Sequence, residues 1–212
     1  MAFPMESLLV CVVLIDLWLL AMSRLVTLVR MAALQGVLIG VLSLYVGGAE
    51  PASILTAAAS LVLKGFVFPF MLMRAIREAR INREVEPYFG MNLSILIGLA
   101  LLALSLWLGS KLTLPVPVAS TLVVPIALFT ILSGLFLIVG RLKALTQIVG
   151  YLVLENGIYA FGLAISQHSP WIVELGILLD VFVAVFIMGV ITYQINREFD
   201  SIDTNQLTDL KD

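Results

Sequence analysis

Apolar residues along this chain come in long runs that short polar breaks separate. Seven runs can be marked, at about 5–23, 27–48, 52–74, 90–110, 119–140, 146–167 and 171–195. A helix of about 20 apolar residues spans the hydrocarbon core of a bilayer. The breaks contain helix-ending residues, such as Gly47-Gly48-Ala49-Glu50-Pro51 and Ser169-Pro170. We therefore predict an all-α, polytopic integral membrane protein with about seven transmembrane helices.

Composition agrees with this prediction and narrows the function classes. Hydrophobic residues make up 61% of the chain and charged residues 12%, whereas about a quarter of a soluble domain is charged. A net charge of −2 does not favour a nucleic-acid partner. Cys11 is the single cysteine, so this chain offers no cysteine set for an iron–sulfur cluster or a Ni-Fe site. We expect no cofactor in this chain.

The basic residues predict the orientation in the membrane. With the N-terminus outside, the inner loops hold ten Lys or Arg residues and the outer loops hold only Lys111. Positive residues gather on the cytoplasmic side of membrane proteins. We therefore predict a multi-pass protein of the cell (inner) membrane, with the N-terminus outside and the C-terminus in the cytoplasm.

The chain divides into four predicted parts. Residues 1–89 form a three-helix unit with a cytoplasmic helical extension, 90–117 a linking helix, 118–199 a second three-helix unit, and 200–212 a cytoplasmic tail. A weak repeat relates the two units, because Arg24–Glu78 and Arg141–Glu198 share one plan: basic turn, helix, outer loop with proline, helix, Arg-Glu. The repeat predicts a 3+1+3 parallel arrangement. Chance similarity between hydrophobic helices is the alternative.

Four ionisable residues fall near the middle of predicted spans: Asp16, Lys64, Glu155 and Asp180. Glu155 lies about 13 Å from the inner end of its predicted helix, and Asp180 lies about 13 Å from the outer end of its own. In a hydrocarbon core about 30 Å thick, both residues therefore fall near the midplane. A charged residue there costs about 2.5–3.5 kcal/mol on insertion scales. Burial favours a neutral carboxyl and a nearby cation favours a charged one. A carboxyl balanced between these effects can load and release a proton.

Helical spacing places further polar residues around these groups. Gln147, Tyr151, Glu155, Tyr159, Gly162 and Ser166 follow at steps of three or four and form a polar stripe. This stripe can order water or pass protons toward Glu155. In the third span, Pro69 frees the carbonyl of Gly65 and is expected to loosen the helix beside Lys64.

Each of these residues also has a structural interpretation. Lys64 could extend its stem toward the inner interface, and Asp16 could be a structural partner of a neighbouring helix. Glu155 and Asp180 could form a static pair that fixes helix register. Otherwise, the predicted proton-path residues are Glu155, Asp180, Lys64, Asp16, Tyr151 and Tyr159.

Two segments carry a resemblance to a known family: Gly150-Tyr-Leu-Val-Leu-Glu155-Asn156-Gly157 and Glu174-Leu-Gly-Ile-Leu-Leu-Asp180. The chain resembles the hydrogenase-4 component E family, and its last three spans are similar to the small three-helix K-type (4L) subunit of complex I. The resemblance implies a relay role for Glu155 and for Asp180, which stands where the complex I pattern has a glutamate. It also implies partners: large antiporter-like membrane subunits and hydrogenase-module subunits that would hold the redox centres.

Three functions follow as hypotheses. The leading one is a membrane-arm subunit of a complex-I-like hydrogenase or oxidoreductase, with buried acids in a proton (or cation) translocation path. The second is a structural scaffold that links antiporter-like subunits to the hydrogenase core. The third, a stand-alone small transporter, is disfavoured because the sequence has no inverted repeat and no paired broken helices.

Overall fold

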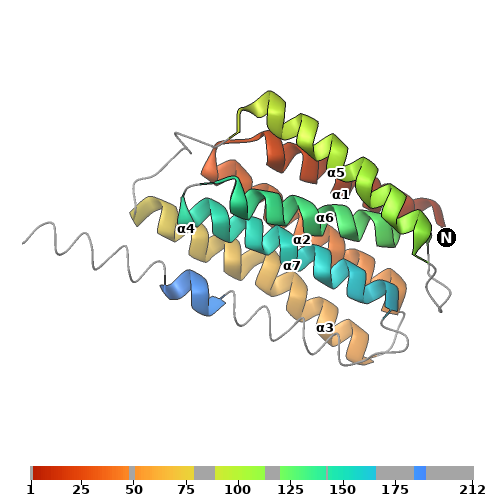
Figure 1. Cartoon of the computed structure of the whole chain (residues 1–212). Coiled ribbons are helices and arrows are strands. Elements are labelled where there is room, and N and C mark those ends of the chain that lie inside the picture. The colour runs from red at the N-terminus through yellow and green to blue at the C-terminus, as the bar shows by residue number, and fades with distance from the viewer. Residues whose placement is uncertain are drawn as a thin grey trace, which may run out of the picture.

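The computed structural model describes residues 2–47, 51–78, 89–112, 120–141, 143–165 and 184–189 (Figure 1). Within these ranges the regular structure is helical, with no strand, which confirms the all-α prediction. The elements are α1 (Ala2–Ala21), α2 (Leu25–Gly47), α3 (Pro51–Val62), a π-helical segment η1 (Leu63–Val67), α4 (Phe68–Glu78), α5 (Met91–Lys111), α6 (Val123–Val139) and α7 (Ala144–Ile165).

The first six predicted spans coincide with these helices. α3, η1 and α4 follow one another without a break from residue 51 to 78, so together they form the predicted third span and the start of its extension. Of the seventh predicted span, the structure describes 184–189, which are helical. The second half of the predicted repeat, the four-part division and the tail therefore stay predictions.

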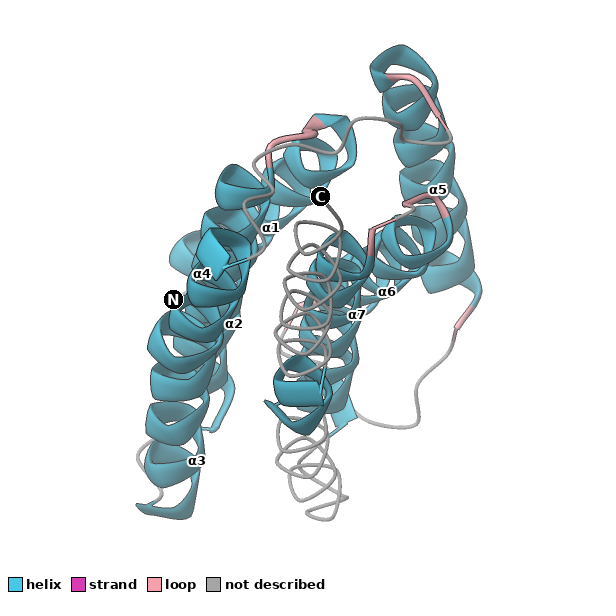
Figure 2. Ribbon diagram, turned by 90° about the vertical axis from the view of Figure 1, so that its left-hand side faces the viewer, coloured by secondary structure: helices cyan, strands magenta, loops and turns pink. Residues whose placement is uncertain are grey.

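Helix α7 packs along α6 as an antiparallel hairpin and along α2 on another side. α2 also contacts α1, α3 and α4, while α5 covers α1 and α6. Both views place α5 at one edge of the bundle and α3 at the opposite edge (Figures 1 and 2). Residues 64 and 155, far apart in sequence, are thereby carried by helices that both pack against α2.

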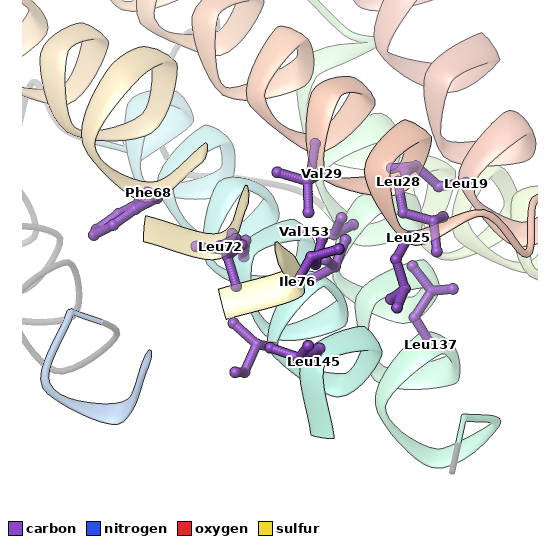
Figure 3. Packing of buried hydrophobic residues seen from close by; sticks show 14 of the residues in the cluster. Leu19, Leu25, Leu28, Val29, Phe68, Leu72, Ile76, Leu137, Leu145 and Val153 are labelled. Carbon is purple, nitrogen blue, oxygen red and sulfur yellow. The ribbon is translucent and has the colours of Figure 1, made fainter. Parts of the chain in front are cut away.

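Two hydrophobic clusters fill the two ends of the bundle. One cluster joins the C-terminal end of α1, the N-terminal end of α2, α4, the end of α6 and the first turns of α7. Its buried side chains converge from these helices (Figure 3). The other cluster joins the opposite ends of α1, α2, α6 and α7. Between the clusters, at mid-helix, lie buried polar residues: Asp16, Gln35, Thr130, Glu155 and Asn156.

Glycines let α6 and α7 approach so closely that their backbones are in contact. A Cβ atom added to Gly157 would lie 2.6 Å from the backbone nitrogen of Ile131. One added to Gly134 would press on the backbone of Leu154, and one added to Gly150 would lie 2.9 Å from the nitrogen of Ile138. Small residues at helix crossings are the usual means of close packing in membranes. This packing fixes α7 rigidly beside α6.

Length and composition identify membrane-crossing candidates among the described helices. Leu25–Val46 and Met91–Lys111 are long and apolar enough to cross a membrane. Val123–Val139 is apolar but shorter. The predicted number of spans and the predicted orientation stay predictions.

The α6–α7 contact predicts the effect of a single methyl group. Gly134→Ala should lower the free energy of unfolding by about 1–3 kcal/mol, because the new Cβ meets backbone that cannot rotate away. Gly189→Ala is the matched control, since a Cβ there meets nothing within 4 Å. Reversible unfolding in mixed micelles measures both. Equal stability of the two variants would mean that α6 and α7 are not in such close contact.

Candidate functional site

The centre of the site is an ion pair between Lys64 of η1 and Glu155 of α7. The Lys64 Nζ lies 2.6 Å from Glu155 Oε1. The exposed fractions of the two side chains are 5% and 2%, so water reaches neither charge freely. An ion pair this buried contributes little to stability compared with apolar residues of similar volume. Stability therefore does not explain the presence of this pair, and we expect it to have a role other than folding.

Lys64 lies on a π-helical turn rather than on regular α-helix. The N–H of Phe68 donates to the carbonyl of Leu63, five residues back, instead of to the carbonyl of Lys64. Pro69 has no N–H to offer the carbonyl of Gly65. The predicted loosening of the helix beside Lys64 is thus present as a π-helical turn, a feature that often marks functional sites.

Two glycines on α2 bring the π-helical turn close to the bundle core. Gly36 and Gly40 are spaced four residues apart on one face of α2. A Cβ added to Gly36 would lie 2.8 Å from the Cβ of Lys64, and one added to Gly40 would lie 2.8 Å from Leu61 Cδ2. Without side chains at these positions, Lys64 passes α2 and reaches Glu155.

Tyr159, one turn beyond Glu155 on α7, provides a second partner for the Lys64 cation. The Lys64 Nζ lies 5.0 Å from the centre of the Tyr159 ring, within the range of a cation–π interaction. The Tyr159 hydroxyl donates to the hydroxyl of Ser43 on α2, at 3.1 Å. Polar groups therefore continue from the ion pair toward the predicted outer end of the bundle.

A small cavity adjoins the ion pair on the opposite side. Its volume is about 10 Å³, roughly the space that one water molecule requires. Its lining includes Lys64, Pro69, Leu152 and Asn156. Leu152 precedes Glu155 on α7 and Pro69 follows Lys64, so the cavity lies on the side of the pair that faces the predicted inner end.

A second polar group joins four helices next to the ion pair. Gln35 of α2 donates through Nε2 to Asp16 Oδ1 of α1, at 2.6 Å. Thr130 of α6 lies 2.7 Å from Asp16 Oδ2. Asn156 of α7 donates through Nδ2 to Gln35 Oε1, at 3.2 Å. The chain of contacts runs from Asp16 to Asn156, the neighbour of Glu155.

The structure brings together most of the residues that the sequence singled out. Lys64 contacts both Glu155 and Tyr159, while Tyr151 is partly buried and packs against the hydrophobic cluster at the first turns of α7. Asp16 is hydrogen-bonded to Gln35 of α2 and Thr130 of α6, and both its proton-path role and its structural alternative stay predictions. The alternative in which Lys64 extends to the interface is wrong, because its side chain is buried in an ion pair. Asp180 lies outside the described residues.

The amide residues of this site, Gln35 and Asn156, were assigned no role from the sequence. Each is a polar residue inside an otherwise apolar run, and that position was the available signal. Thr130 gave none, because a threonine in an apolar helix commonly bonds to its own backbone. Arg141, predicted as a loop cation, is buried and donates to the carbonyl of Met22 at 2.8 Å, where it tethers the segment after α1.

Chemically, this arrangement can stabilise a charge and change its protonation. A carboxylate beside an ammonium group favours its charged form, and the same carboxyl alone in an apolar core favours its neutral form. A change in the Lys64–Glu155 distance would therefore favour uptake or release of a proton at Glu155. Among the residues that the structure describes, no group of three or more His, Cys, Asp or Glu side chains could hold a metal ion.

Comparisons with known proteins give relatives for most of the chain and a family model for its C-terminal part. Residues 120–212 match the family model for NADH-ubiquinone/plastoquinone oxidoreductase chain 4L. An uncharacterized protein of Mycobacterium tuberculosis is 36% identical over 193 residues, 87% of this chain and 85% of the relative. Hydrogenase-4 component E of Escherichia coli K12 is 28% identical over 155 residues, 73% of this chain and 72% of the relative. No solved structure matches.

The ion pair predicts a specific pattern in a double-mutant cycle. Lys64→Met should lower the free energy of unfolding by about 3–5 kcal/mol, because it leaves Glu155 buried without its cation. Adding Glu155→Leu should restore much of that loss, since the double variant buries no charge at either position. Unfolding of each variant in mixed micelles gives the coupling energy. Additive losses would show that the two side chains do not interact.

Proposed function

Because this chain belongs to the hydrogenase-4 component E family, we propose that it is a membrane subunit of a complex-I-like hydrogenase or oxidoreductase. In that complex the Lys64–Glu155 pair forms part of a proton (or cation) path. The observation that carries the proposal is the burial of both charges at mid-helix, between two hydrophobic clusters. Ionisable residues inside a membrane are costly and mark such paths.

Glu155 is the group that takes up and releases the proton. While Lys64 stays at 2.6 Å, the ammonium stabilises the carboxylate and Glu155 is charged. When Lys64 moves away, the apolar surroundings favour the neutral acid and Glu155 binds a proton. The return of Lys64 expels the proton. Movement of one cation is thus converted into transfer of one proton.

The surroundings of Lys64 support such a movement. The π-helical turn that holds Lys64 lacks the regular main-chain ladder around the carbonyls of Lys64 and Gly65. The Tyr159 ring, 5.0 Å from Nζ, provides a partner that stabilises the ammonium away from Glu155. Electrostatic interactions in a low-dielectric core act over several ångströms, so charge changes in a neighbouring subunit can bias Lys64.

Protons reach the pair from its two polar sides. On the predicted inner side, the cavity beside Lys64 and Asn156 has room for about one water. On the outer side, the Tyr159–Ser43 hydrogen bond continues from the pair. Asp180, which the resemblance places in the relay, is proposed as the next protonatable group.

Electron transfer takes place on other subunits in this proposal. The single cysteine of the chain cannot ligate a cluster by itself. Hydrogenase-module subunits would hold the redox centres, and large antiporter-like subunits would continue the path in the membrane. Helix α5 offers such a subunit a contact surface, because only 17% of its most apolar stretch is buried against the rest of the protein.

Glu155→Gln tests the relay most simply. The amide keeps the size of the side chain but binds no proton, so proton translocation by the assembled complex should fall by at least about tenfold. Glu6→Gln is the matched control, because Glu6 is exposed on α1, and it should translocate protons normally. Acidification in inverted membrane vesicles measures both variants.

The state of the complex separates the relay from the scaffold alternative. Native gel electrophoresis of the same membranes reports assembly. An assembled but inactive Glu155→Gln complex is the predicted result. Normal translocation by an assembled variant would exclude the relay, and loss of assembly with this variant would favour a scaffold role instead.

A further inference from the structure

Beside Asp16, one hydroxyl group lies within hydrogen-bond distance of two acceptors. The Thr130 hydroxyl lies 2.7 Å from Asp16 Oδ2 and 3.0 Å from the carbonyl of Ile126. A threonine hydroxyl has one proton to donate. If it donates to an ionised Asp16, the oxygen of Ile126 faces the Thr130 oxygen with no proton between them. Both contacts can be hydrogen bonds only if Asp16 carries a proton and donates it to the Thr130 oxygen, because a carbonyl oxygen has no proton to donate.

We infer that Asp16 is a neutral carboxylic acid whose proton lies on Oδ2. Asp16 then donates to Thr130, Thr130 donates to the carbonyl of Ile126, and Asp16 Oδ1 accepts from Gln35. Each proton has one donor and one acceptor in this arrangement. Hydroxyls in helices commonly donate to the carbonyl four residues earlier, which agrees with the Thr130–Ile126 contact.

The charge surroundings of Asp16 favour the same assignment. Its side chain is fully buried, and among the described residues no cation lies within ion-pair distance of it. Buried carboxylates are normally paired with cations or held by several donors. Glu155, by contrast, has the nearby cation Lys64. The two buried acids thus have different surroundings.

The neutral acid has a positioning function. It fixes the amide of Gln35, because Oδ1 can only accept and so selects the Nε2 end of that side chain. Gln35 Oε1 is thereby turned toward Asn156 and accepts from its Nδ2. Asn156 is the residue after Glu155 and lines the cavity beside Lys64. Asp16 is therefore a positioning residue. Through Gln35 it orients Asn156 next to the ion pair, and its proton is structural.

The protonation of Asp16 is independent of the proposed function, whereas its positioning role rests on that function, because the role serves the Lys64–Glu155 pair. Asparagine is the closest mimic of a neutral aspartic acid, since its Oδ1 accepts from Gln35 and its Nδ2 donates to Thr130. Asp16→Asn should therefore restore what Asp16→Ala removes. The Asn variant should unfold at the temperature of the wild type, while the Ala variant, in which the Nε2 of Gln35 loses its acceptor, should unfold earlier.

Infrared spectroscopy of the full chain in lipid nanodiscs at neutral pH detects the proton directly. The wild-type spectrum should contain a carbonyl stretch of a protonated carboxylic acid that shifts in D2O and disappears in Asp16→Asn. Glu6→Gln is the control and should retain the band. Absence of a band sensitive to Asp16→Asn would overturn the inference. An Asp16→Asn chain that unfolds as early as the Ala variant would overturn it as well.

Vesicle measurements extend the test to the positioning role. An assembled Asp16→Asn complex should translocate protons at a rate within about twofold of the wild type, because the amide reproduces the hydrogen bonds of the acid. Loss of translocation by that assembled variant would make Asp16 a relay group and would contradict the structural proton.

Discussion

The contact between Lys64 and Glu155 is the constraint on which the rest of the structure depends. Two charges this deep in an apolar bundle are stable only while they remain close together. The surrounding features serve that proximity: glycine at position 36 lets Lys64 pass α2, and the close α6–α7 hairpin holds α7 in place. The two hydrophobic clusters lie on either side of the polar layer that Asp16, Gln35, Thr130, Glu155 and Asn156 form, and apolar surroundings strengthen the electrostatic interaction of the pair.

The polar layer contains two acids with different surroundings. Glu155 lies beside the cation Lys64, whose other neighbours are an aromatic ring and a small cavity. Asp16 has an amide and a hydroxyl, both neutral, as its partners. Gln35 and Asn156 connect the two acids. The first acid provides the chemistry in this account, and the second fixes the geometry in which the chemistry takes place.

The sequence predicted the helices well and the contacts between them less well. Apolar runs located the helices because a membrane span needs a fixed length of apolar chain, so the predicted 119–140 became helix 123–139. Depth followed from the rise per residue, which put Glu155 at mid-helix. Its partner did not follow, because rotation about a helix axis is set by packing. Gly36 and the π-helical turn at Lys64 determine that rotation. The spacing of apolar residues along the chain does not reveal the effect of either one.

Lys64 and Glu155 are in direct contact inside the helix bundle, and this contact can be measured in a bilayer. Solid-state NMR of the full chain in lipid bilayers, with ¹⁵N-labelled lysine and ¹³C-labelled glutamate, measures dipolar coupling between the Lys64 Nζ and the Glu155 carboxyl carbon. The Lys64→Arg variant identifies the Lys64 signal. We expect strong dephasing of that signal, because the ion pair has a nitrogen–oxygen distance of 2.6 Å. The dephasing should be lost in Glu155→Gln labelled in the same way. A Lys64 signal without dephasing in the wild-type chain would place the two side chains apart and contradict the account.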